Sequence, residues 1–327
     1  SVCINTIIVS ILLNAKPDQI KLLMVDPKKV ELTPYTRLPH MLAPVITEPQ
    51  GAAAALKWLV KEMEVRYEIL KLIGVRNIDS FNKRSIQPDV EAALERDIPS
   101  HMPYIVCIID ELADLMMVAS QDIETPIARI AQMARAVGIH LVLATQRPSR
   151  EVITGLIKAN FPTRIAFKVA SRVNSQIILD DVGAESLLGN GDLLFLPPGS
   201  SHLIRAQGAF VRDEDIQKLV HTICSQASPS YLIQSFDHPH LLEDRLEEEA
   251  AVSLDPLLKE AKEIVLSTGN ASTTFLQRKL KIGYARAASL MDLLEKQGVV
   301  GPAEGNKPRK IFKPSAGNSI ELDSDDF

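Results

Sequence analysis

Short runs of apolar residues alternate along the chain with longer segments in which apolar residues recur every three or four positions. The short runs at 20–25, 104–109 and 139–144 predict strands that are buried on both faces. The longer segments, of which 2–13 and 50–73 are the clearest, predict amphipathic helices. Strands and helices that alternate in this way predict an α/β domain with a mainly parallel sheet and right-handed crossovers.

The chain after this core predicts more strands and a closing helix. A helix is expected to run through 123–137, and the closing helix is expected at 213–224, with Asp213 as its N-cap. The later strands are expected at 163–169, 192–196 and 203–210.

The last quarter of the chain has a different pattern. A polar, strongly acidic stretch is typical of a linker between domains. Three short helical patterns follow, at 256–266, 273–281 and 284–297, and the apolar residues at 299–300 and 310–312 predict a small β-wing, which together make a winged helix-turn-helix. The predicted boundaries are an α/β domain at 1–228, an acidic linker at 229–254, a winged-helix domain at 255–315 and a disordered tail at 316–327.

Composition narrows the class of protein. The 327 residues carry a net charge of −5, so contact with nucleic acid would need a local basic patch rather than a basic surface overall. Cys3, Cys107 and Cys224 are scattered without metal-ligand spacing, which favours a reduced, cytoplasmic compartment. We find neither a run long enough to span a bilayer nor a signal peptide.

The strand at 104–109 is followed at once by two acids, Asp110 and Glu111. Ligands of open α/β sheets bind beyond the carboxyl ends of the strands, which is where these side chains are expected. One acid there can help to hold the Mg²⁺ of a nucleotide, and a second can orient or deprotonate an attacking water. The alternative, a solvated acidic turn, is about as frequent for so short a motif.

Several longer motifs point to one family. They include Asp26-Pro-Lys, Val75-Arg-Asn, Ile109-Asp-Glu-Leu-Ala-Asp-Leu-Met, Ala134-Arg-Ala-Val-Gly-Ile-His, Ala144-Thr-Gln-Arg-Pro-Ser and Thr154-Gly-Leu-Ile-Lys-Ala-Asn. On these motifs the chain resembles the motor of the FtsK/SpoIIIE DNA translocases over roughly 1–225, and the segment that begins at Gln277 resembles the family's γ winged helix. The resemblance implies a RecA-like P-loop motor domain followed by a small winged helix-turn-helix domain.

The resemblance implies roles for particular residues, with ATP and Mg²⁺ as the cofactors. Ser1 would be the last residue of the phosphate loop and a Mg²⁺ ligand, so we expect the loop's glycines and lysine before residue 1. Asp110 would hold the water shell of the ion, Glu111 would activate the hydrolytic water, and Gln146 would sense the γ-phosphate. The alternatives are that Ser1 is an ordinary helix N-cap and that Gln146 only ties its loop.

Motors of this family act as homo-hexameric rings, which implies an arginine supplied by the neighbouring subunit. Arg135 is our first candidate and Arg147 and Arg164 are the others, although each is also consistent with an ordinary surface arginine. The resemblance further implies double-stranded DNA as the partner, contacts with division and recombination proteins, and a full-length protein anchored in the bacterial inner membrane at the division site. Any membrane contact would be made by segments outside this chain.

The winged-helix region has the local basic patch that the whole chain lacks. Residues 278–313 hold nine basic and three acidic residues, which favours binding to DNA phosphates, although a solvated helical face is the alternative. The helix at 284–297 would enter the major groove. It carries Ala285, Ser289 and Asp292 where the family usually has Asn, Arg and an acid, which puts the usual DNA signal in doubt. The DNA-binding candidates are Arg278, Lys279, Lys281, Arg286, Ser289, Lys307 and Arg309.

These observations favour an ATP-driven double-stranded DNA translocase motor that acts in chromosome segregation and cell division. Two alternatives stay open: a related ring ATPase that moves protein, and a non-catalytic DNA-binding or assembly fragment. Whether the chain is itself an enzyme depends on a phosphate loop that we expect before residue 1.

Overall fold

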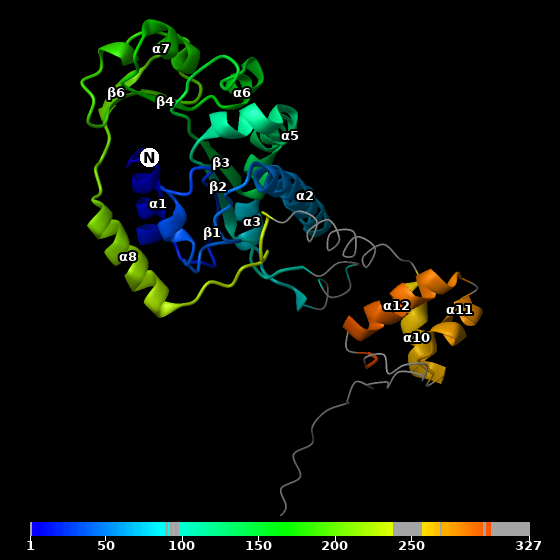
Figure 1. The fold of residues 1–327 in the computed structure, drawn as a ribbon. Coiled ribbons are helices and arrows are strands. Elements are labelled where there is room, and N and C mark those ends of the chain that lie inside the picture. Colours follow the sequence, from blue (N-terminus) through cyan, green and yellow to red (C-terminus); the bar gives the residue numbers. More distant parts are fainter. Residues whose placement is uncertain are drawn as a thin grey trace, which may run out of the picture. The chain divides into compact units, whose positions relative to one another are not determined.

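A parallel three-stranded sheet lies at the centre of the first part of the chain (Figure 1). Its strands are β1 (Ile20–Val25), β2 (Tyr104–Ile109) and β3 (Ile139–Leu143), in the order β1-β2-β3, which confirms the three predicted strands. The computed structural model describes residues 2–88, 91, 94, 98–237, 257–268, 270–280, 282–296 and 299–301. It divides into two compact units, Ser1–Pro239 and His240–Phe327.

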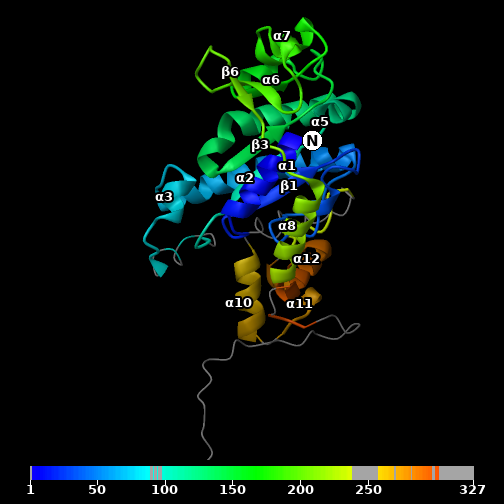
Figure 2. The same ribbon diagram turned by 90° about the vertical axis from the view of Figure 1, so that its left-hand side faces the viewer.

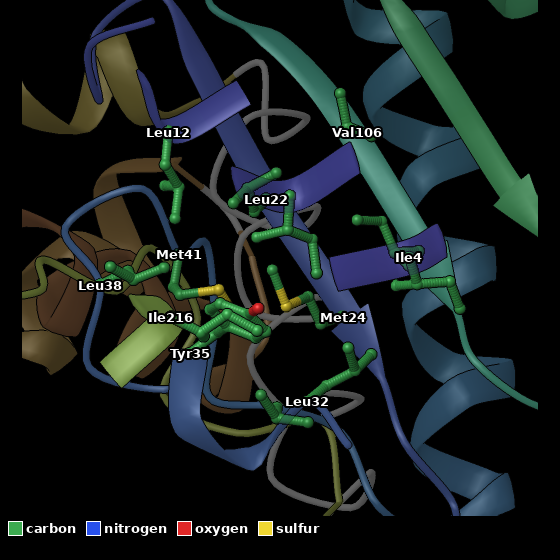
Figure 3. Packing of buried hydrophobic residues seen from close by; sticks show 13 residues of the cluster. Ile4, Leu12, Leu22, Met24, Leu32, Tyr35, Leu38, Met41, Val106 and Ile216 are labelled. Carbon is green, nitrogen blue, oxygen red and sulfur yellow. The ribbon is translucent and has the colours of Figure 1, made fainter. Parts of the chain in front are cut away.

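One face of the parallel sheet packs against α1 (Val2–Asn14). Alternate apolar side chains of β1 and β2 point to this face and meet the apolar side chains that recur along the helix (Figure 3). The shared core contains Ile4, Ile8, Leu12, Leu22, Met24, Val106 and Ile108, with Ile216 of α8 (Asp213–Gln226) beside them.

The other side of the sheet is covered by α2 (Pro49–Ile73) and α5 (Leu112–Met133). The helix that the sequence predicted through 123–137 is longer than expected, because α5 begins directly after Glu111, whose side chain caps it. Ala119 interrupts α5 with non-helical φ of −145° and ψ of 52°, and the helix passes into the 3₁₀ helix η2 (Ala134–Val137). Shorter elements on this unit are η1 (Thr33–Tyr35) and α3 (Ile78–Asn82).

The three later strands form a separate antiparallel sheet in the order β4-β5-β6. They are β4 (Arg164–Phe167), β5 (Asp192–Leu196) and β6 (Ile204–Gln207), so the strands were predicted correctly but do not extend the parallel sheet. With α7 (Arg172–Leu179) and η3 (Ala184–Ser186) they enclose a small core of their own, while α6 (Gly155–Asn160) packs against α5. Helix α5 lies between α2 and α6 (Figure 1 and Figure 2) and thereby connects the two layers.

Helix α8 closes the first unit, but its start differs from the prediction. The N-cap residue is Arg212, and no side-chain hydrogen bond caps the helix, so the prediction that Asp213 is the cap is wrong. Asp213 is instead the first residue of an acidic first turn, where negative charge interacts favourably with the helix dipole.

Residues 231–237, which we call the exit strap, fold back onto the first unit. We expected the linker to begin at 229, yet Ile233 and Phe236 are buried. Phe236 packs edge-on against Trp58, with ring centroids 6.1 Å apart, and the backbone N–H groups of Leu232 and Ile233 donate to the carbonyl oxygen of Leu42. Two apolar side chains therefore hold a segment that the predicted boundary assigned to the linker.

The end of the exit strap lies against the beginning of α2. The carboxylate of Asp237 accepts hydrogen bonds from the backbone N–H groups of Thr47 and Glu48, at 3.1 to 3.2 Å, and from the Thr47 hydroxyl at 3.1 Å. Gly51, in the first turn of α2, allows this approach, because a Cβ there would lie 2.4 Å from Asp237 Oδ1 and 3.0 Å from the Phe236 carbonyl oxygen.

The described residues of the second unit form three helices, α10 (Leu258–Thr268), α11 (Thr273–Leu280) and α12 (Tyr284–Lys296), as the sequence predicted. Ala261, Val265, Leu276, Leu290 and Leu294 bury their side chains between these helices, and Val299 and Val300 join this core. The expected wing residues 310–312, most of the expected acidic linker and the tail at 316–327 lie outside the described residues. Within the described ranges, no helix combines the length and apolarity needed to cross a bilayer.

The strap contact predicts that Gly51→Ala destabilises the first unit. The backbone at Phe236 and Asp237 would have to move away from the added Cβ, and we expect unfolding to become easier by about 1 to 3 kcal/mol, as for other overpacked sites. Equilibrium urea unfolding measures the change.

The matched control is Gly155→Ala in α6, where an added Cβ meets no heavy atom within 4 Å. This change should be neutral or slightly stabilising. Equal stabilities for the two variants would contradict the close approach of the strap.

Candidate active site

The carboxyl ends of the three parallel strands bring together residues that are far apart in the sequence. Val25 pairs with Ile109, and Ile109 pairs with Leu143, so the segments that follow these residues lie side by side. The backbone N–H of Asp110 donates to the Val25 carbonyl oxygen at 3.1 Å, and that of Leu112 donates to the Ala144 carbonyl oxygen at 2.8 Å. The acids after β2 are therefore held between the ends of the two neighbouring strands.

Glu111 is fully buried, and its carboxylate is the point at which these segments meet. Its Oε1 accepts a hydrogen bond from the Thr145 hydroxyl at 2.6 Å and one from the Ala113 backbone N–H at 3.3 Å, which caps α5. The backbone N–H of Gln146 donates to both oxygens, at 3.3 and 3.1 Å, and Lys28 Nζ lies 3.3 Å from Oε2.

These donors decide the ionisation of Glu111. Burial alone would raise its pKa, but the hydrogen bonds from Thr145, Gln146, Lys28 and Ala113 outweigh burial and hold the pKa below its usual range. Glu111 is therefore a carboxylate at neutral pH, and both of its oxygens have partners.

Asp110 is also buried, but it lies among carboxylates, whereas Glu111 lies among hydrogen-bond donors. Burial raises the pKa of its carboxyl group, the neighbouring carboxylates of Asp26 and Glu31 raise it further, and Lys28 opposes the rise. Its Oδ2 atom is buried and has no hydrogen-bond partner among the described residues. A buried carboxylate oxygen without a donor is an expected feature of a site that receives a cation.

The turn after β1 is built around Asp26, which is fully buried. Its Oδ1 accepts from the backbone N–H of Lys28 at 3.2 Å, and its Oδ2 accepts from that of Leu32 at 2.9 Å. This places Lys28 next to Glu111. The sequence predicted no role for Lys28 or Thr145, although each lies within three residues of the end of a buried strand, as the acids do.

The amino end of α1 lies at the same edge of the sheet. Ile4 is near the Met24 end of β1 and Leu12 is near the Leu22 end, so the helix runs antiparallel to the strand (Figure 3). An amino end in this place favours anions, because its backbone N–H groups are unpaired and the helix dipole is positive there. Ser1, the predicted Mg²⁺ ligand, lies outside the described residues.

Gln146 is placed beside Glu111 by its backbone, while its side chain is exposed. Arg147, next to it, forms an ion pair with Asp114 at 3.4 Å. The exposed amide of Gln146 is thus available at the edge of the site, and its backbone position is fixed by the buried acid.

The two other candidate arginines are not brought to this edge. Arg135 is exposed in η2, which precedes β3, so it lies at the opposite edge of the parallel sheet. Arg164 pairs with Asp180 at 2.5 Å and donates to three carbonyl oxygens, which ties it to the antiparallel layer.

The second unit exposes part of the predicted basic patch. Arg278 and Lys279 are exposed in the last turn of α11, and Arg286 is exposed on α12. Ser289 lies on α12, while Lys281, Lys307 and Arg309 lie outside the described residues.

The donor set fits Mg²⁺ rather than a metal held by protein alone. In the part of the chain that the structure describes, no group of three or more His, Cys, Asp or Glu side chains is placed to hold a metal ion. Mg²⁺ is usually bound through one or two carboxylates, waters and substrate phosphates, which a single free carboxylate such as Asp110 matches.

A parallel sheet with paired acids at its carboxyl edge, preceded by a helix whose amino end faces them, defines a RecA-like P-loop motor domain. The second unit adds a winged helix-turn-helix domain. A model of the FtsK/SpoIIIE family matches residues 1–150, and a model of the Ftsk gamma domain matches residues 252–314. The chain belongs to the FtsK/SpoIIIE family.

Curated relatives agree with this assignment. "DNA translocase FtsK" of Chlamydia muridarum is 62% identical over 312 residues, which are 95% of this chain and 39% of the relative. "DNA translocase SftA" of Bacillus subtilis is 52% identical over 314 residues, 95% of this chain and 31% of the relative. "DNA translocase SpoIIIE" of the same organism is 49% identical over 312 residues, which are 95% of this chain and 38% of the relative. The chain spans well under half the length of these relatives.

Solved structures share the fold of the first unit. The conjugation coupling protein TcpA of pCW3, determined with ATPγS, is 29% identical with a TM-score of 0.53, and the match covers 67% of this chain and 61% of that protein. The cytoplasmic domain of the type VII secretion ATPase EccC of Thermomonospora curvata is 21% identical with a TM-score of 0.55, covering 70% and 27%. At that identity the second match shows the fold alone.

The contrast between the two acids predicts opposite effects for two similar substitutions. Asp110→Asn removes a buried charge that has neighbouring carboxylates, so we expect stability at neutral pH to rise by about 1 kcal/mol. Glu111→Gln places an amide N–H₂ among donors, so we expect a loss of about 2 to 4 kcal/mol. Equilibrium unfolding between about pH 7 and pH 3 measures both.

The direction in which each acid changes the stability of the fold with pH follows from the direction of its pKa shift. The pKa of Glu111 is lowered by folding, so its stabilising effect is present at neutral pH and is lost as the pH falls through that pKa. The pKa of Asp110 is raised by folding, so its destabilising effect is also present at neutral pH and disappears in acid. Glu64→Gln, in an exposed pair with Arg129, is the control and should change stability by less than about 0.5 kcal/mol. Two changes of the same sign would contradict this account of the site.

Proposed function

We propose that this chain is the motor and DNA-binding part of an ATP-driven double-stranded DNA translocase that acts in bacterial chromosome segregation and cell division. The observation that carries the proposal is the Oδ2 of Asp110, buried and without a hydrogen-bond partner among the described residues, beside the ionised Glu111 at the carboxyl edge of a parallel sheet. Relatives named as DNA translocases and the Ftsk gamma match in the second unit support DNA as the substrate.

The residues at this edge suggest how ATP and Mg²⁺ are held. Asp110 would hold the ion through its water shell, and Ser1 would supply a hydroxyl ligand. When bound, Mg²⁺ would neutralise charge on the phosphate oxygens. The amino end of α1 would offer backbone N–H groups to the phosphates.

Glu111 is the proposed acceptor of a proton from the attacking water, because it is ionised and lies next to Asp110. Gln146 is the proposed sensor of the γ-phosphate, because its backbone is fixed by Glu111 while its side chain remains exposed at the same edge.

A ring of identical subunits would complete the site. Arg135 is the proposed arginine from the neighbour, since it is exposed and lies at the edge of the sheet opposite its own chain's acids. A homo-hexamer is the proposed assembly, and division and recombination proteins are proposed partners of the whole protein. Anchoring in the inner membrane at the division site would require segments other than those described here.

Two other functions have some support. The fold shared with a secretion ATPase allows a ring motor that moves protein, but the exposed basic residues of α11 and α12 favour DNA. A non-catalytic DNA-binding or assembly role would follow if no phosphate loop precedes residue 1.

Extension of the chain upstream tests the proposed activity. We expect Gly-x-x-x-x-Gly-Lys in frame immediately before Ser1. The extended protein should hydrolyse ATP faster when double-stranded DNA is added. Residues 1–327 alone should hydrolyse ATP poorly. Glu111→Gln should lower kcat by at least about 100-fold while ATP still binds, because it removes the proton acceptor.

Glu64→Gln in the extended protein is the control and should keep the parent rate. Stimulation by a peptide but not by DNA would favour the protein-moving alternative. Near-family turnover by 1–327 itself, or no turnover by the extended protein, would contradict the proposal as stated.

The basic residues of the second unit predict salt-dependent DNA binding. We expect Arg278→Ala with Lys279→Ala to weaken binding to every duplex sequence alike and to lower the slope of log K against log salt by about two, one for each lost phosphate contact. Fluorescence anisotropy over a salt series measures this. Lys262→Ala, at an exposed position on α10, is the control and should leave the slope unchanged. An unchanged slope in the double variant would exclude the surface of Arg278 and Lys279 as the DNA contact.

A further inference from the structure

Lys28 differs from the other groups that bind Glu111. Three of the four donors are the Thr145 hydroxyl and the backbone N–H groups of Gln146 and Ala113, all on segments that adjoin the buried acid. The fourth is Lys28 Nζ, which reaches Oε2 from the turn after β1 at 3.3 Å. Its side chain is 34% exposed, whereas that of Glu111 is fully buried. Lys28 donates from the end of a long, partly exposed side chain, so it can leave without movement of the backbone.

The occupied carboxylate poses a problem for hydrolysis. A general base must reach the proton that it removes with a free oxygen lone pair, and both oxygens of Glu111 already accept hydrogen bonds. Oε2 accepts only from Gln146 N–H and from Lys28 among the described residues. Departure of Lys28 would free Oε2 while Thr145, Gln146 and Ala113 keep the side chain in place.

The turn that carries Lys28 is held in position from two sides. Asp26 accepts from its backbone, as described above, and Lys29 forms an ion pair with Glu48 at 2.8 Å. Lys29 has a φ of 60°, a left-handed conformation that is uncommon for a residue other than glycine. The contact between Lys28 and Glu111 is therefore part of a constrained turn and not a loose surface pair.

We propose that Lys28 is a positioning residue that restrains Glu111 in the nucleotide-free chain and releases it when the site is filled. An ammonium group this close to the site would exchange its carboxylate partner for the phosphates of a nucleotide, which carry more negative charge. The inference rests on the proposed function, because it assigns to Lys28 the control of the residue that activates the water.

The first experiment needs no nucleotide and no activity. Backbone amide exchange of Gln146 reports on Glu111, because that N–H donates to both oxygens of the carboxylate. Lys28→Met should speed this exchange at least fivefold, Lys28→Arg should restore it to near the wild-type rate, and Lys57→Met should leave it unchanged. Lys57 is the matched control because its pair with Asp122 is exposed and joins α2 to α5 away from the site.

The second experiment measures hydrolysis by the extended protein with and without double-stranded DNA. Lys28→Met should raise the DNA-independent kcat several-fold and lower the ratio of stimulated to unstimulated rates, with Lys28→Arg close to wild type. A lower kcat with an unchanged ratio, or unchanged exchange at Gln146, would overturn the proposal, since Lys28 would then only support the fold.

The two experiments separate failure of this inference from failure of the proposed function. If the extended wild-type protein shows no hydrolysis, the proposed function fails, and exchange at Gln146 alone decides whether Lys28 restrains Glu111. If hydrolysis is stimulated by DNA but both Lys28 variants behave as Lys57→Met does, the function stands and the restraint is excluded.

Discussion

The buried carboxylate of Glu111 is the interaction on which the rest of the site depends. A fully buried charge is tolerated only when donors surround it, and here the donors come from the ends of all three parallel strands. Lys28 follows β1, Glu111 itself follows β2 and caps α5, and Thr145 and Gln146 follow β3. One acid thus fixes the relative positions of three loops that the sheet alone would leave free.

Asp110 gains its character from the same arrangement. The donors at the strand ends are used by Glu111, and Asp26 takes the N–H groups of its own turn. Asp110 Oδ2 is therefore left buried without a donor from the part of the chain that the structure describes. Burial raises the pKa of both acids, but hydrogen-bond donors outweigh it at Glu111, whereas at Asp110 the carboxylates of Asp26 and Glu31 add to it. Unequal sharing of donors between adjacent acids is a feature of sites that keep one group in reserve for a ligand.

The sequence predicted what depends on local pattern and missed what depends on distant partners. Apolar runs located all three parallel strands and placed the two acids at the edge of the sheet, because burial and strand direction are visible in neighbouring residues. The separate antiparallel sheet was not predicted, because the residues of β4 and its neighbours do not indicate which strand β4 pairs with. Lys28 gained a role only once its reach to an acid 83 positions away was known, and Asp213 looked like a cap because residue type alone does not fix φ and ψ.

The exit strap is a second feature that depends on distant partners and was therefore missed in the sequence. It links the last described residues of the first unit to residues near its beginning. Ile233 and Phe236 bury against residues from much earlier in the chain, such as Trp58, which the predicted linker boundary at 229 did not anticipate. Asp237, the last described residue before 257, fixes the backbone of Glu48, whose side chain pairs with Lys29 in the turn that carries Lys28. Two polar contacts in series, Asp237 with Glu48 and Glu48 with Lys29, therefore link the exit strap to the turn that carries Lys28.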